Sequence, residues 1–162
     1  MRGSTLHRGA DGFTLVELII IVTIVAILAA IAIPNFMSYR AKARQTEAKV
    51  GLGGLHTSAM AYAAEQNTFI VSPLALLGFQ LAGASGYDFY YGGTTPSLKV
   101  MPASGGASAP CSVAPTVAPL PAMSTSGFTA AAIGNIDVDV TCDEWEINDL
   151  RILTNGRNDV TQ

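Results

Sequence analysis

The sequence predicts an α+β fold in which one long N-terminal helix packs on a small antiparallel sheet. Two patterns support this prediction: an apolar run that passes into an amphipathic helical pattern, and a later series of short strand-like segments. The 162 residues accommodate one modest domain and one membrane segment. The net charge of −3 gives no global basis for nucleic-acid binding, without excluding a local patch.

Residues 13–33 form an apolar run that contains one carboxylate, Glu17. About 20 residues that rise ~1.5 Å each cross the ~30 Å hydrocarbon core of a bilayer, so the run predicts a transmembrane helix. A carboxylate in hydrocarbon costs roughly 2.5–3.5 kcal/mol on insertion scales. We therefore expect Glu17 to have a charged partner, rather than to be a helix-end acid that reaches the membrane surface. Because no apolar segment precedes the run, any processing site lies ahead of it and leaves the helix on the mature protein.

Helical signals continue beyond the apolar run to about residue 66. One helix face carries apolar residues at spacings of three, seven and ten, namely Leu52, Leu55, Ala59 and Tyr62. We expect this face to pack on the sheet. A helix from residue 13 to about residue 65 would extend roughly 80 Å, more than a globular domain needs.

Two features interrupt the helical pattern. Pro34 removes the backbone hydrogen bond to the carbonyl of Ala30 and costs around 3 kcal/mol in a helix interior, so we expect a kink or a melted turn there. The proline also fits a simple membrane boundary. Gly51, Gly53 and Gly54 each weaken a helix by about 1 kcal/mol relative to alanine. Either a strand approaches the helix closely at these glycines, or the helix is broken there.

Residues 67–162 are expected to form a globular head. Residues 87–93 predict a strand closed by a Gly-Gly turn, whereas residues 101–127 are rich in Pro, Ala, Ser and Gly and predict a loop without regular structure. Further strands are expected at 128–133, 138–141, 145–148 and 150–154. Trp145 is expected to anchor the core of this sheet.

The junction between residues 12 and 13 resembles that of the type IV pilin superfamily, which includes pilins and the pseudopilins of type II secretion. The matching residues are Gly12, Phe13, Thr14, Leu15, Val16 and Glu17, followed by the apolar run and Pro34. The resemblance implies that a prepilin peptidase cuts between Gly12 and Phe13 and methylates the new amino group of Phe13. It also implies a leader at 1–12, a protruding transmembrane and filament-core helix at 13–34, an amphipathic half at 35–66, and the head at 67–162.

Cleavage at this point would explain the lone acid. It creates a cationic amine on Phe13, which Glu17 can approach along the same helix face. The pair can neutralise itself while the subunit waits in the bilayer. In the filament that the resemblance implies, Glu17 of one subunit would meet the Phe13 amine of a neighbour, where an unmatched charge is costly.

Cys111 and Cys142 are the only cysteines. In an exported domain, two cysteines without metal-type spacing most often form a disulfide, with free thiols as the alternative. A bond between them would close a loop of about 30 residues and stabilise the fold by about 3–4 kcal/mol in the chain-entropy account. It would resemble the C-terminal disulfide loop of many pilins, although the Pro-rich segment here falls largely inside the loop.

Four acidic residues near the C-terminus are weak candidates for a calcium site, as found in some pseudopilins: Asp137, Asp139, Asp143 and Glu144. They lack EF-hand spacing. We therefore favour a solvated acidic loop and expect no metal or other cofactor.

No catalytic motif is apparent, so we do not expect an enzyme. His7 would be lost with the leader, and His56 has no second histidine with which to bind a metal, so both are expected to be structural or incidental. A basic band follows the apolar run and consists of Arg40, Lys42 and Arg44. These residues would pair with acids of neighbouring subunits or with lipid headgroups.

The sequence therefore favours a structural subunit of a type IV pilus. The resemblance implies storage in the inner membrane, an assembly platform with cytoplasmic ATPases, and polymerisation with identical subunits into a cell-surface filament for motility, adhesion or DNA uptake. The alternatives are a type II secretion pseudopilin, a minor pilin at the filament tip and, more distantly, a membrane-anchored enzyme or binding module. Nucleic acid as a partner lacks a supporting pattern.

Overall fold

The computed structural model describes residues 13–81, 83, 85–93, 99–101, 111, 114–136 and 141–161. The expected leader at 1–12 lies outside this part of the chain. The chain divides into two compact units, Met1–Met37 and Ser38–Gln162. The first contains the apolar part of the N-terminal helix, and the second contains the rest of that helix together with the sheet.

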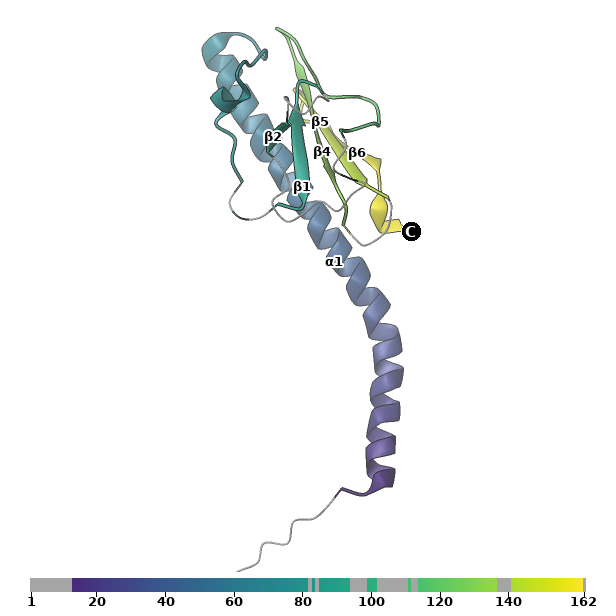
Figure 1. Cartoon of the computed structure of the whole chain (residues 1–162). Helices are drawn as coiled ribbons and strands as arrows, with labels where there is room; N and C mark the ends of the chain where they lie inside the picture. The colour runs from purple at the N-terminus through teal and green to yellow at the C-terminus, as the bar shows by residue number, and fades with distance from the viewer. Residues whose placement is uncertain are drawn as a thin grey trace, which may run out of the picture. The chain divides into compact units, whose positions relative to one another are not determined.

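The long helix is confirmed as α1, Leu15–Gln66, with 52 residues (Figure 1). Pro34 lies inside it, and the residues on both sides of the proline are helical, so no turn is melted here. The side chain of Asn35 donates to the carbonyl of Ile31 at 3.1 Å and adds a hydrogen bond next to the one that Pro34 removes. Bending or melting at Pro34 in a filament stays a prediction.

The head contains an antiparallel sheet with strand order β2-β1-β4-β5-β6, and β3 also pairs with β4 (Figure 1). The strands are β1 Tyr87–Tyr91, β2 Lys99–Met101, β3 Ala122–Met123, β4 Phe128–Gly134, β5 Asp143–Asn148 and β6 Leu153–Arg157. Two short 3₁₀ helices complete the elements: η1 Leu74–Leu77 and η3 Asp159–Thr161. The predicted α+β class is confirmed.

The strands at β1 and β4 match their predicted ranges closely, whereas the predicted start of β5 and the predicted loop at 101–127 need correction. Strand β5 begins at Asp143, two residues before the predicted start. The expected loop at 101–127 is interrupted by β3, which pairs with the start of β4. Residues 138–140 of the predicted strand at 138–141 lie outside the described part, and Thr141 itself is not in a strand.

The last predicted strand is shifted because a tight turn occupies its start. The backbone N–H of Arg151 donates to the carbonyl of Asn148 at 2.9 Å, and the side chain of Asn148 accepts from the N–H of Ile152 at 2.8 Å. Arg151 has a φ of 61°, a left-handed conformation that few non-glycine residues adopt. Strand β6 therefore starts only at Leu153.

The predicted amphipathic face of α1 is buried against the sheet. Leu52, Leu55 and Ala59 are fully buried, and Tyr62 packs partly against the same core. Aromatic residues of β1 and β4 supply much of the opposing surface, and Trp145 is part of this core as predicted. The burial of this apolar face, rather than helix propensity, holds the glycine-containing part of α1 in place.

The structure decides between the two interpretations of the glycines. A Cβ atom on Gly51 would lie 2.3 Å from the ring of Phe89 on β1, which is closer than any real contact. A Cβ on Gly54 would lie 3.3 Å from the ring of Phe79, whereas one on Gly53 would meet nothing within 4 Å. The helix is not broken: Gly51 lets the sheet approach it closely.

The close contact between Gly51 and Phe89 can be tested by substitution, with Gly53 as the control. Gly51→Ala should lower the free energy of unfolding by about 1–3 kcal/mol, because the new methyl group overlaps Phe89. Gly53→Ala should instead raise the free energy of unfolding by about 0.5–1 kcal/mol, because alanine is the better helix former and the space is open. Chemical denaturation of the full-length chain in detergent would measure both. Similar effects of the two substitutions would contradict the close approach.

Candidate functional site

The apolar part of α1 is exposed along its length. Its most apolar window has a mean hydropathy of 3.0, none of that window is buried, and it is long enough to cross a membrane. It is the one such helix among the described residues. An exposed apolar surface of this extent marks a site of contact with lipid or with another protein.

The one charged residue of the apolar run, Glu17, lies at its N-terminal end together with Thr14. The hydroxyl of Thr14 accepts a hydrogen bond from the backbone N–H of Glu17 at 3.2 Å, so Thr14 is the N-cap of α1. Glu17 is consequently the third helical residue, where a carboxylate interacts favourably with the positive end of the helix dipole. Phe13 lies immediately before the cap and is exposed.

The capping role of Thr14 was not predicted from the sequence, although Thr14 is one of the residues that carry the resemblance. The signal was present, because a threonine followed three residues later by a glutamate is the capping-box pattern. The cap fixes where the helix begins. It thereby places Phe13 one residue before the cap and Glu17 in the first turn of the helix.

A second polar centre lies inside the head and is formed by the carboxylate of Asp143, which is fully buried. Its oxygens accept hydrogen bonds from groups on five different elements. The donors are Gln45 Nε2 at 2.7 Å, Tyr87 OH at 2.7 Å, Trp145 Nε1 at 2.5 Å, Asn155 Nδ2 at 3.3 Å and Asp159 N at 3.3 Å. Burial, and then the charge of Asp143, raise the pKa of the Tyr87 phenol far above its ordinary value, so this phenol remains a donor.

These contacts correct our interpretation of the C-terminal acids. Asp143 and Glu144 are buried strand residues and do not belong to a solvated loop. The oxygens of Asp143 face N–H and O–H donors, which is the environment of a structural carboxylate rather than a calcium ligand. Asp137 and Asp139 lie outside the described residues, and the part that is described contains no group of three potential metal ligands.

Glu144 points to the opposite face of the sheet, where it holds part of the disulfide loop. It accepts from the backbone N–H groups of Thr116 and Val117 at 3.1 and 2.9 Å and from the Thr116 hydroxyl at 3.0 Å. Arg157 Nη1 lies 3.4 Å from the same carboxylate. A surface segment is thus fixed by a buried charge.

Glu146 lies two residues further along the same face and is also buried. Thr154 donates to one of its oxygens at 3.0 Å, and within the described part of the chain the other oxygen has no hydrogen-bond partner. Burial is the main cause that raises the pKa of Glu146, and the charge of Glu144 adds to it. Gly156 leaves room for this carboxyl group, because a Cβ there would lie 2.5 Å from the unpartnered oxygen.

The predicted disulfide between Cys111 and Cys142 is confirmed, with Cα atoms 5.6 Å apart. Both cysteines are buried in a small cluster with Tyr90 and Ile133. The bond and the Glu144 contacts therefore hold the same segment against one face of the sheet at two points.

The basic band and His56 are the other residues that the sequence singled out. Arg44 donates to the carbonyl of Ile136 at 2.6 Å, a contact within its own chain that we did not predict, whereas Arg40 and Lys42 are exposed. His56 is structural as expected, because its Nε2 lies 3.1 Å from the carbonyl oxygen of Asp149.

Comparison with known proteins places this N-terminal segment in a family. Residues 7–33 match a family model described as the prokaryotic N-terminal methylation motif. The chain is 30% identical over 186 residues to the type IV major pilin protein PilA of Myxococcus xanthus, covering 91% of this chain and 83% of that protein. It is 36% identical over 74 residues to the type IV wide pilus major component PilA4 of Thermus thermophilus, covering 46% of this chain and 56% of that protein. A 45-residue match to the type IV major pilin protein PilE1 of Neisseria gonorrhoeae is 49% identical and covers 28% of this chain and 26% of that protein.

The Asp143 centre can be tested by removing its charge. Asp143→Asn should lower the free energy of unfolding by about 3 kcal/mol, because an amide replaces one acceptor oxygen with a donor that faces other donors. Glu65→Gln removes the same charge at an exposed position and should change the stability by less than about 0.5 kcal/mol. Denaturation followed by the fluorescence of Trp145, the one tryptophan, would report on both. Equal stabilities of the two variants would refute the role of Asp143.

Proposed function

Because this chain belongs to the type IV pilin family, a family of structural pilus subunits, we propose that it polymerises into a surface filament used for motility, adhesion or DNA uptake. It is held in the membrane by its apolar helix before it joins the extracellular pilus. The observation that carries the proposal is the combination of the Gly12-Phe13 junction with Glu17 and the exposed apolar part of α1. Lipid covers this surface before assembly, and the helices of neighbouring subunits cover it afterwards.

Processing is the first step of the proposed function. A prepilin peptidase cuts between Gly12 and Phe13 and methylates the amino group of Phe13, so that the mature chain starts one residue before the cap. Residues 13–34 then form the filament core, 35–66 the amphipathic half of the helix, and 67–162 the head. The Thr14 cap supports this division, because α1 begins at Leu15 and its capping residue would stay on the mature chain.

Glu17, in the first turn of α1, is proposed to set the position of each new subunit relative to its neighbour in the filament. In the assembled filament, the carboxylate of Glu17 pairs with the Phe13 amine of a neighbouring subunit. A subunit that enters out of register leaves both charges unpaired in an apolar environment, which is strongly disfavoured. Capping by Thr14 supports this role, because it fixes Glu17 in the turn closest to the amine.

As the family implies, an inner-membrane platform with cytoplasmic ATPases would drive assembly. Arg40 and Lys42 are exposed and available to acids of neighbours or to lipid headgroups, whereas Arg44 has a contact in its own head. Pro34 would allow the helix to bend or unwind as subunits pack.

The second candidate is a pseudopilin of a type II secretion system, which shares the N-terminal segment. The long segment closed by the Cys111–Cys142 disulfide favours the pilin, because it resembles the C-terminal disulfide loop of many pilins. The match to a named major pilin, which covers 91% of this chain, also favours the pilin.

Filaments sheared from intact cells provide the direct test. We expect this chain to be their main subunit, with a mass that corresponds to residues 13–162 plus one methyl group on Phe13 and minus two hydrogens for the disulfide. Intact-mass and N-terminal analysis would measure both. A chain that starts at Met1 in cells with an active peptidase, or that is absent from surface filaments, would argue for the membrane-anchored module or the pseudopilin.

Glu17→Gln tests this positioning role of Glu17 separately from processing. The variant should be cleaved and methylated normally but should assemble poorly, because the neighbour's amine loses its counter-charge. Glu65→Gln is the matched control on the same helix and should assemble like the wild type. Quantifying sheared filaments against processed subunit in the membrane separates the two steps. Normal filament yield from Glu17→Gln would remove the proposed role of this acid.

A further inference from the structure

Two features on opposite edges of the head sheet are not used by the helix or by the polar centres. Strands β6 and β2 are the two edges, since the strand order is β2-β1-β4-β5-β6. The turn that leads into β6 carries exposed aliphatic side chains. The edge at β2 carries a pocket between this strand and η1.

The projecting feature, which we call the knob, consists of residues 150–153. Leu150, Ile152 and Leu153 are 73%, 54% and 36% exposed. Three exposed aliphatic residues within four positions, on the turn and the first residue of β6, differ from singly scattered exposed residues and indicate a contact surface. The side chain of Asn148 and the left-handed Arg151 hold the turn in one conformation, so little ordering is needed when it binds.

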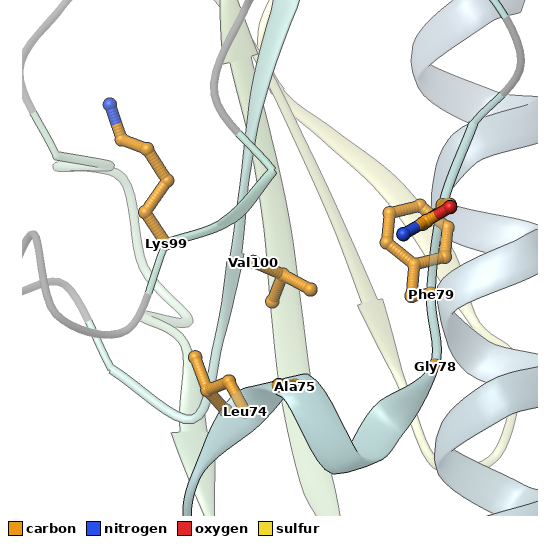
Figure 2. A pocket seen from close by; sticks show the side chains of 7 residues that line it. Leu74, Ala75, Gly78, Phe79, Lys99 and Val100 are labelled. Atoms are coloured by element: carbon orange, nitrogen blue, oxygen red, sulfur yellow. The ribbon is translucent and has the colours of Figure 1, made fainter.

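The receiving feature is a pocket of about 430 Å³ on the β2 edge. Figure 2 shows Val100 of β2 facing the space between Leu74 and Phe79, while the end of the Lys99 side chain points away from it. Ala75 and Gly78 line the side of η1, and Gln80 and Lys99 add polar groups to the lining. A pocket of this size, with Leu74, Phe79 and Val100 in its wall, accommodates two or three aliphatic side chains.

We propose that the knob of one subunit inserts into the β2-edge pocket of the next subunit in the filament. This inference rests on the proposed function, because it assigns a second copy of the chain as the occupant. Contact through two different surfaces on opposite edges is heterologous, and such contacts build open helical polymers rather than closed dimers. The geometry thus fits a chain that polymerises, with Leu150 and Ile152 as the inserted side chains.

Disulfide cross-linking within assembled filaments tests the contact. The chain has two cysteines, and both are in the native bond, so engineered thiols are the free ones. The double variant Ile152→Cys with Ala75→Cys should give a ladder of dimers, trimers and longer species on mild oxidation, because a heterologous contact links each subunit to the next. Each single variant should stay monomeric in denaturing gels.

The outcomes separate the contact from the proposed function. Normal filaments of the double variant without a ladder would overturn the contact while leaving the pilus function intact. Dimers from Ile152→Cys alone would also overturn it, since they indicate a symmetric contact between two knobs. Absence of this chain from wild-type filaments would instead defeat the proposed function.

A second, independent test introduces a charge into the knob and then an opposite charge into the pocket. Leu150→Lys should reduce the filament yield roughly tenfold, because a lysine would have to leave water to enter the pocket. Adding Ala75→Glu should restore the yield. Leu120→Lys, at a comparably exposed leucine outside the knob, is the control and should assemble normally. Each variant must first show wild-type amounts of processed, disulfide-bonded subunit in the membrane. Wild-type filament yield from Leu150→Lys would overturn the contact.

Discussion

The buried carboxylate of Asp143 is the interaction on which the head depends. It accepts hydrogen bonds from groups on α1, β1, β5, β6 and η3. One carboxylate therefore joins the helix to the sheet and to the C-terminal segment. A buried charge is tolerated only when donors replace its water, and here each donor comes from a different element. Gln45 links α1 to this centre, and six residues later Gly51 brings the same helix against Phe89. Together these two contacts fix the position of the amphipathic half along the sheet.

The side chains of β5 alternate between the two faces of the sheet, so the strand contributes to a different set of contacts on each face. Asp143, Trp145 and Ile147 face the helix and its core. Glu144 and Glu146 face the other way and lie beneath the disulfide loop, where Glu144 replaces solvent for two backbone N–H groups. The Pro-rich part of the loop that precedes β3 and β4 has mostly small side chains and offers little core. It is therefore held by a covalent bond and a buried charge rather than by a core of its own.

The parts of this fold that are local could be predicted from the sequence. The helix, β1 and β4 follow from residue periodicity, and the Gly12-to-Glu17 pattern identified the N-terminal segment. The acids at 143 and 144 were misread, because their donors lie as far as 98 positions away in the chain and no local pattern shows them. The start of β6 was missed because the left-handed residue of the turn is an arginine rather than the expected glycine. The residues that form the knob and the pocket show no recognisable sequence pattern, and only the strand order places them on opposite edges of the sheet.

The exposed apolar half of α1 also has a consequence for the supply of subunits. Each methylene transferred from lipid to water costs roughly 0.8 kcal/mol, so about 20 apolar residues make the free aqueous subunit vanishingly rare. Growth of the filament then cannot draw on a dissolved pool. The subunits diffuse in two dimensions, and the number stored in the bilayer, rather than a concentration in solution, sets how much filament a cell can extend.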